Sequence, residues 1–196
     1  MTTSADLASN AISQFGIRQA PITEASVESW PNRPGLYAAY GSADVWRVLG
    51  LGDPPDPRPL YVGKAERSLS SRDVRTHFGF GGGAGNSITG SSTLRRSLSA
   101  LLRTELGFRG RYRNLARPEK SANYGLAPNH DSELSSWMRD NLVAAFWEMT
   151  TSSVPLGDVE TVVLNRLKPP LNIQKVSHQW TKQVKHARSL MAADCA

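Results

Sequence analysis

The fold of this chain is decided by two short apolar runs, Gly35-Leu36-Tyr37-Ala38-Ala39-Tyr40 and Leu60-Tyr61-Val62-Gly63-Lys64-Ala65. Pro34 precedes the first run, and a proline-rich connection at 52–59 precedes the second. Short apolar runs bounded by proline and glycine are typical of buried strands. We therefore expect two strands, of which the first carries Tyr37 and the second Tyr61 in an apolar environment.

A helix is expected directly after the second run, over residues 68–78. Leu69, Val74 and Phe78 are its apolar positions, and serines near its start are available as caps. Between the two runs, residues 45–49 (Val-Trp-Arg-Val-Leu) indicate a further strand. Residues 52–59 contain four prolines and predict a loop, because proline removes hydrogen-bond donors and restricts the backbone.

The remaining chain alternates helical patterns with one more apolar run. Residues 142–147 (Leu-Val-Ala-Ala-Phe-Trp) are long enough for a central strand and too short for a helix. Helices are expected over 4–15, 93–106, 131–141 and 158–167 and in the tail from Trp180, whereas 108–130 lacks periodicity and predicts a long loop. Together these elements predict a small α/β domain with a central, largely antiparallel three-stranded sheet flanked by helices.

The same pattern suggests how the chain is divided. We expect an N-terminal arm or helix at 1–33, a main domain at 34–176 and a C-terminal helix at 177–196. A helical and basic insertion is expected within the main domain at about 80–141.

Composition is that of a single globular domain without disulfides. The chain has 196 residues, and its one cysteine, Cys195, cannot form an internal disulfide. No apolar run approaches the roughly 18 residues that span a bilayer, and the first residues lack a basic region followed by an apolar stretch. We therefore expect a cytoplasmic protein without a membrane partner.

The formal net charge of +6 at pH 7 favours a polyanionic partner. Much of the positive charge follows the glycine-rich stretch at 79–87. The candidate nucleic-acid contacts are Arg75, Arg95, Arg96, Arg103, Arg109, Arg111 and Arg113. A solvated helix face and loop is the alternative interpretation of this span.

Several chemistries find no support in the sequence. The four histidines, His77, His130, His178 and His186, form no zinc-binding pattern, and no Gly-x-Ser-x-Gly elbow indicates a serine hydrolase. The glycine-rich stretch follows a helix instead of a strand and lacks Gly-Lys-Ser/Thr, so a loop is favoured over a nucleotide cradle, which stays the alternative.

Phosphodiester hydrolysis needs a carboxylate that holds a metal ion, a group that deprotonates water, and cations that stabilise charge on the phosphate. Glu160 is the notable carboxylate, because it lies on an amphipathic helix that ends just before Pro169-Pro170. By itself a helical glutamate is ordinarily solvated, and Tyr37 and Tyr61 would ordinarily be core residues.

Taken in order, these residues resemble the GIY-YIG nuclease family. The family pattern is Gly-x-Tyr, Tyr-x-Gly often followed by Lys-Ala, an arginine and a histidine or tyrosine on the next helix, a later helical glutamate, and then an asparagine. The corresponding residues here are Gly35, Tyr37, Tyr61, Gly63, Lys64, Arg72, His77, Glu160 and Asn172. The resemblance covers about 34–175 and implies a DNA endonuclease.

The resemblance also implies roles. Glu160 would hold one divalent ion, Mg²⁺ or a similar cation, and Tyr37 would accept a proton from the attacking water. Lys64 and Arg72 would balance charge, Tyr61 would orient water or a phosphate oxygen, and His77 would assist Tyr61. Gly35 and Gly63 would be structural, and Asn172 would brace the Glu160 helix.

The spacing of two of these residues leaves the catalytic arginine open. Arg72 and His77 are five residues apart, where the family commonly has four, and five residues turn the two side chains away from each other on a regular helix. A local bulge would bring both into the site, or Arg75 would take the cationic role.

Three functions therefore follow from the sequence. The first is metal-dependent hydrolysis of DNA by water, in which double-strand cleavage would need a dimer or sequential nicks. The second is a catalytically lapsed module that binds DNA or RNA. The third is a nucleotide-binding switch built on the glycine-rich stretch.

Overall fold

The computed structural model describes residues 2–80, 87–113, 123–150 and 153–195. Its elements in chain order are α1 (Ser4–Ile17), β1 (Ala20–Pro21), α2 (Glu24–Glu28), β2 (Gly35–Gly41), α3 (Ala43–Val48), β3 (Tyr61–Ala65), α4 (Arg72–His77), the 3-10 helix η1 (Thr89–Ser91), α5 (Thr93–Leu101), β4 (Arg111–Tyr112), β5 (Tyr124–Gly125), α6 (Pro128–Asn141), β6 (Leu142–Glu148), α7 (Leu156–Leu167) and α8 (Thr181–Ala193).

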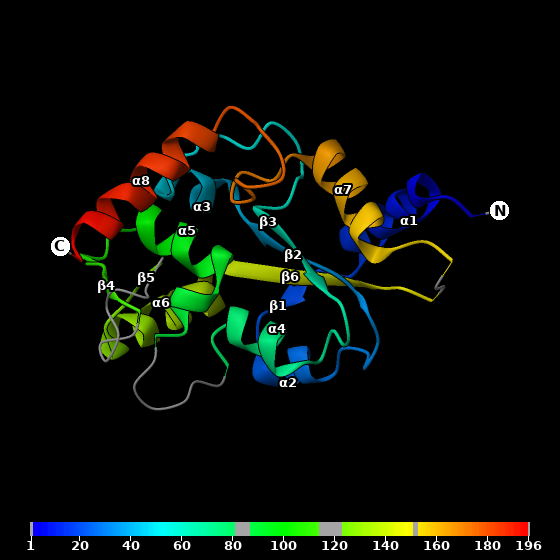
Figure 1. Cartoon of the computed structure of the whole chain (residues 1–196), viewed down its shortest axis with the longest axis horizontal. Helices are drawn as coiled ribbons and strands as arrows, with labels where there is room; N and C mark the ends of the chain where they lie inside the picture. Colours follow the sequence, from blue (N-terminus) through cyan, green and yellow to red (C-terminus); the bar gives the residue numbers. More distant parts are fainter. Residues whose placement is uncertain (1, 81–86, 114–122, 151–152, 196) are drawn as a thin grey trace.

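A central antiparallel sheet confirms the expected α/β fold. Its strand order is β1-β6-β2-β3, so the three expected strands lie together and a short fourth strand, β1, is added at the edge. Pro21 is tolerated in β1 because an edge strand can spare a backbone donor. Figure 1 shows the sheet at the centre of the molecule, with helices on both sides.

The two faces of the sheet carry separate cores, which explains why β2 reads as continuously apolar. Leu36 and Ala38 face α1 and α7, where Phe15 and Val163 are buried. Tyr37 faces the other core, which α2, α4, α5, α6 and α8 complete. In Figure 1, α1 and α7 lie together at one end of the sheet and α5 and α8 at the other.

The expected strand at 45–49 is wrong, because this segment forms α3. The Ser42 side chain caps α3 by accepting a hydrogen bond from Val45 N at 3.3 Å. Helical spacing then buries both Val45 and Trp46, and the Trp46 ring meets Trp180 edge-to-face at 5.4 Å. Tertiary packing therefore overrides the strand preference of this sequence.

Other element ends also differ from expectation. α4 begins at Arg72, directly after its capping residue Ser71. α6 begins at Pro128, three residues before the expected start at Asp131, whose side chain accepts a hydrogen bond from Ser87 in the interior and does not cap the helix. The strands β4 and β5 pair within the expected loop at 108–130. Most of the glycine-rich stretch, residues 81–86, lies outside the described residues. No helix in the described part of the chain is long and apolar enough to cross a membrane.

Candidate active site

A pocket of about 690 Å³ opens where β2, β3 and α4 meet. It brings together three of the expected catalytic residues, Tyr37, Lys64 and His77. Its lining also includes Ala65, Glu66, Arg67, Ser71 and Val74. We call this hollow the tyrosine pocket. Residues separated by about 40 positions in the sequence thus share one cavity.

Tyr37 is seated in this pocket by a glycine on the neighbouring strand. Tyr37 pairs with Gly63 in the register of β2 and β3. A Cβ atom at position 63 would lie 2.2 Å from Tyr37 Cζ, so only glycine leaves room for the ring. Gly35 is restricted in the same way, because a Cβ there would lie 2.1 Å from the carbonyl oxygen of Trp147. Both glycines act by allowing close approach.

The Tyr37 hydroxyl is hydrogen-bonded to His77. Its oxygen lies 3.0 Å from His77 Nδ1, and the two rings meet edge-to-face. α4 is held in place for this contact by Val74 and Phe78, which are buried, and Phe78 packs on the Tyr37 ring. With the ring proton on Nε2, Nδ1 accepts from the hydroxyl and makes the tyrosine a better base. His77 therefore contacts Tyr37, whereas the resemblance implied assistance to Tyr61.

Tyr61 lies beside Tyr37 with its ring centroid 6.3 Å away. Burial, with a smaller contribution from the charge of Glu160, raises the pKa of Tyr61 to about 12. A hydroxyl with this pKa stays protonated at neutral pH. Tyr61 is therefore suited to donating a hydrogen bond to water or to a phosphate oxygen, and unsuited to acting as the base.

Glu160 is a buried carboxylate near this group. Its exposed fraction is 6%, with Val159 and Val163 of the same helix in the core. Its Oε2 accepts a hydrogen bond from Lys175 Nζ at 2.5 Å, and its charge acts on both Tyr61 and Lys64. A buried carboxylate needs a cation, and in this structure Lys175 provides it.

Lys64 lies at the rim between the tyrosine pocket and α7. Its ammonium group is 2.6 Å from Glu66 Oε1. This hydrogen bond, and to a smaller extent the charge of Glu160, raises the pKa of Lys64. Lys64 therefore remains charged at neutral pH and is suited to balancing negative charge on a phosphate.

Asn172 braces β3, whereas the expectation was that it would brace the Glu160 helix. Its Oδ1 accepts from Val62 N at 2.9 Å, and its Nδ2 donates to Val62 O at 2.8 Å. The neighbouring Leu171 N donates to Leu60 O at 3.0 Å. The segment after α7 is thus fastened along the free edge of β3, which fixes Tyr61 and Gly63 relative to α7.

The structure describes the side chain of one of the two candidate catalytic arginines, Arg75, and not that of the other, Arg72. Arg75 forms ion pairs with Glu24 and with Glu28, the latter at 3.0 Å, and so ties α4 to α2. These ion pairs give Arg75 a structural role. Arg72 is the first residue of α4, but its side chain lies outside the described part of the structure.

Two of the expected nucleic-acid contacts are buried, so their assignment to a phosphate-contacting surface is wrong. Arg95 is fully buried, and its guanidinium meets Asp131. Arg96 is 6% exposed and donates to the side chains of Asn123 and Thr93. The helical pattern placed both arginines off the leucine stripe of α5, but α6 and α8 cover the sides that sequence alone assigns to solvent.

The other basic residues of this span lie at or near the surface. Arg103 is paired with Asp194 at 2.9 Å, and Arg111 donates to Leu126 O at 2.6 Å. Arg109 and Arg113 are exposed, and Arg109 donates to the carbonyl of Phe108. Only these two arginines of the span project into solvent without a side-chain ion pair among the described residues.

Asp131 is the organising residue of this buried polar cluster, and Asp131→Asn tests it. Asp131 accepts hydrogen bonds from Ser87 Oγ at 2.7 Å and from Thr89, and it is the only carboxylate paired with Arg95 among the described residues. We expect Asp131→Asn to lower the free energy of unfolding by about 3 kcal/mol, because a buried guanidinium loses its counter-charge. Urea unfolding followed by circular dichroism measures this.

Asp140→Asn, on the exposed side of the same helix, is the matched control and should change stability by less than about 0.5 kcal/mol. Equal effects of the two substitutions would show that the Arg95 cluster does not stabilise the fold.

Sequence reasoning did not assign a role to Lys175 or Arg67. Lys175 lies just three residues beyond Asn172, and Arg67 lines the tyrosine pocket. The sequence indicated Lys175 only indirectly, since the Glu160 carboxylate lies beside inward-facing valines and therefore requires a nearby cation. No periodicity marks either residue.

Glu160 fits a divalent ion by its chemistry. The described part of the chain has no cluster of three or more His, Cys, Asp or Glu side chains able to hold a metal. One carboxylate completed by water and phosphate oxygens is nevertheless a common environment for Mg²⁺. The Lys175 ammonium shows that the Glu160 carboxylate accepts a cation, and the lysine side chain is half-exposed, so water can hydrate its ammonium if another cation takes its place.

Comparison with known sequences assigns the family. The chain matches the family described as "GIY-YIG catalytic domain" over residues 56–192, more than two thirds of its length. The matched range includes Tyr61, His77, Glu160 and Asn172, and it begins after Tyr37. No curated protein and no solved structure matches the chain. The tyrosine pocket and this match together show that the chain belongs to the GIY-YIG family, whose membership indicates a nuclease acting on nucleic acid.

Proposed function

We propose that this protein hydrolyses DNA phosphodiester bonds with an activated water and a divalent ion held by Glu160. The observation that carries the proposal is the hydrogen bond between the Tyr37 hydroxyl and His77 Nδ1, at 3.0 Å, within the tyrosine pocket. A hydroxyl bonded to an imidazole acceptor and open to a cavity can take a proton from water.

In the proposed reaction, the water oxygen bonds to phosphorus as its proton passes to the Tyr37 oxygen, while the Tyr37 proton passes to His77. Tyr61 donates a hydrogen bond to the water or to a phosphate oxygen, and Lys64 balances charge on the phosphate. The bond from phosphorus to the leaving oxygen then breaks, and that oxygen takes a proton from solvent. Mg²⁺ at Glu160 would supply Lewis-acid stabilisation of the developing charge.

Cleavage of DNA by the purified full-length chain tests the proposal. We expect supercoiled plasmid to be nicked or linearised with Mg²⁺ or Mn²⁺ and to stay intact with EDTA. A homodimer would produce linear DNA early, whereas a monomer would accumulate nicked circles first. Failure to cut supercoiled, linear and single-stranded DNA with any divalent ion would refute the enzymatic proposal.

One observation favours a second function, a nucleic-acid-binding module without catalysis. Lys175 donates to Oε2 of Glu160 and so competes with a metal ion for this carboxylate. In that case the protein would bind DNA or RNA with a steep salt dependence and without cleavage. If the protein is only a binding module, Lys175→Ala will also fail to cut DNA. If the ion pair between Lys175 and Glu160 does not prevent metal binding, the wild type will cut DNA.

A further inference from the structure

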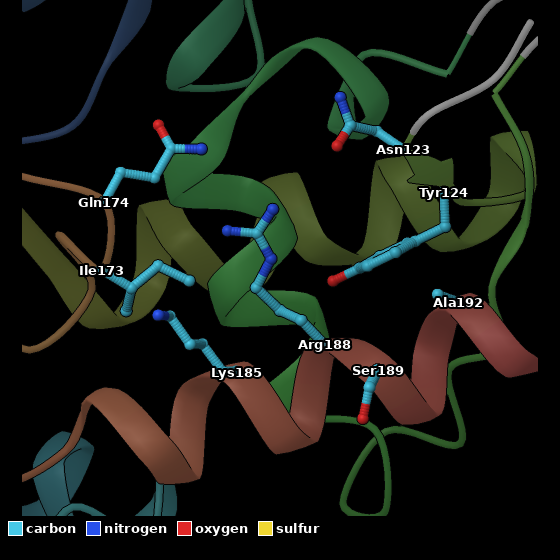
Figure 2. Close-up of a pocket in the computed structure, with 8 residues that line it drawn as sticks. All are labelled: Asn123, Tyr124, Ile173, Gln174, Lys185, Arg188, Ser189 and Ala192. Atoms are coloured by element: carbon cyan, nitrogen blue, oxygen red, sulfur yellow. The ribbon is translucent and has the colours of Figure 1, made fainter.

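A second pocket, of about 560 Å³, lies between α8 and the segment after α7. We call it the α8 pocket, and its lining includes Asn123, Tyr124, Ile173, Gln174, Lys185 and Arg188. Figure 2 shows the Arg188 side chain rising from α8 into the middle of the pocket, between Gln174 and Tyr124, with Lys185 on the same helix. No Asp or Glu is among the described residues that line it.

Arg188 is half-buried, and one end of its guanidinium is enclosed without a hydrogen-bond partner among the described residues. Its Nη1 is inaccessible to solvent and has no hydrogen-bond partner among the described residues. A buried donor without a partner costs free energy, and one on a charged group costs more. A buried donor without a protein partner commonly binds a water molecule, an ion or a ligand.

Positive charge accumulates around this unpaired donor. Arg96 donates hydrogen bonds to Asn123, which lines the pocket, and to Thr93. Burial, together with the charge of Arg188, lowers the pKa of Arg96 to about 10, and burial lowers the pKa of Arg188. Within Thr181–Ala193 the chain carries basic residues and no acidic one. The pocket therefore concentrates positive charge that no described carboxylate offsets.

The α8 pocket adjoins the candidate active site through one short segment. Asn172 is fastened to β3 and Lys175 to Glu160, while Ile173 and Gln174 between them line the α8 pocket. Arg96 is also close enough to Tyr61 for each charge to affect the pKa of the other. The segment that fastens Glu160 and β3 therefore also forms part of the α8 pocket.

We propose that the α8 pocket binds a phosphate group, which accepts hydrogen bonds from the Arg188 guanidinium and receives a counter-charge from Lys185. A guanidinium is the side chain best suited to a phosphate, because its donors match two phosphate oxygens at once. The source that fits the proposed nuclease function is a backbone phosphate of the substrate strand away from the scissile bond. In this respect the inference rests on that function. Free phosphate has the same chemistry and is the second source.

The first test measures thermal stability of the full-length chain in inorganic phosphate at constant ionic strength. We expect saturating phosphate to raise the Tm of the wild type by about 3 °C and to leave Arg188→Gln unchanged. Without phosphate, the Tm of Arg188→Gln should equal or exceed that of the wild type, because the substitution removes a charged group whose buried donor has no described partner. A lower Tm would mean that Arg188 serves the fold.

The second test measures binding of a labelled DNA duplex in EDTA over a series of salt concentrations. Arg188→Gln should weaken Kd about tenfold at 0.1 M salt and reduce the slope of log Kd against log salt by about one. Lys185→Gln should reduce the slope in the same direction. Lys182→Gln is the matched control, because it removes one charge from an exposed position of the same helix that does not line the pocket.

A response in either test supports a phosphate site, and the two tests separate its sources. A reduced salt slope assigns the pocket to the strand, and stabilisation by phosphate alone assigns it to a free phosphorylated ligand. No response in either test, or equal responses of Arg188→Gln and Lys182→Gln, would overturn the proposal. Wild-type protein that binds the duplex but never cuts it would overturn the nuclease function, and the response of Arg188→Gln would still decide whether the pocket binds phosphate.

Discussion

Glu160→Gln is expected to lower the rate of Mg²⁺-dependent DNA cleavage by about 10³-fold. The substitution keeps the size of the side chain and removes the charge that would hold a divalent ion. Folding should be preserved, because Lys175, the partner of Glu160, has a side chain that is 53% exposed and can be hydrated instead. The measurement is plasmid cleavage at saturating enzyme, with Tm recorded on the same preparation.

Asp158→Asn provides the matched control for this experiment. Asp158 lies in the first turn of the same helix and is exposed, so it loses the same charge without touching the site. We expect its cleavage rate to stay within about twofold of the wild type. If Glu160→Gln cleaved at the wild-type rate with an unchanged Tm, Glu160 would not hold the metal ion and the proposed mechanism would be incorrect.

Tyr37→Phe is expected to lower the cleavage rate by 10² to 10⁴-fold, roughly the contribution of a positioned acid or base. The phenylalanine ring fills the same space above Gly63, so the loss is confined to one hydroxyl and its bond to His77. That loss should lower the free energy of unfolding by only about 1 kcal/mol. Single-turnover cleavage separates this effect on chemistry from effects on DNA binding.

The hydrogen bond between Tyr37 and His77 predicts that the two residues act together in catalysis. If the proton of Tyr37 passes to His77, the double variant Tyr37→Phe/His77→Gln should be no slower than Tyr37→Phe alone, because the two residues act as one unit. Tyr40→Phe is the matched control, since Tyr40 lies on the same strand and packs in the other core. Multiplicative losses in the double variant would show that His77 acts separately from Tyr37.

The distribution of arginines changes where nucleic acid should bind. Arg95 and Arg96 form part of the interior, and Arg75 and Arg103 are held in ion pairs. Arg109 and Arg113 remain exposed, and further basic residues line the two pockets, with Arg67 and Lys64 at one and Lys185 and the half-buried Arg188 at the other. We expect substrate contacts at these basic residues and not at the buried or ion-paired arginines.

Much of the fold was predictable from sequence because its decisive elements are local. The apolar runs of β2, β3 and β6 are buried on both faces, and such runs stand out in any sequence. The prolines after α7 and the capping serine before α5 likewise act on their immediate neighbours. The order of tyrosines, glutamate and asparagine was sufficient to indicate the family.

Residues that act through distant partners could not be placed in this way. The segment that forms α3 is helical because Trp46 and Trp180 pack together, although they lie far apart in the chain. Arg95 is buried because Asp131 meets it, and Glu160 is neutralised by Lys175 across a helix end. Local periodicity describes only one element at a time and does not show what covers its other side.

The sequence by itself determined three central strands, the two tyrosines on them and the helix that carries Glu160, since each depends on spacing within one element. Only the tertiary structure decided that the Tyr37 hydroxyl meets His77, that Asn172 fastens β3, and that Arg188 Nη1 has no partner among the described residues around a basic pocket. The physical reason is that hydrogen bonds and charge pairs form over about 3 Å, and only the folded chain brings their partners to that distance.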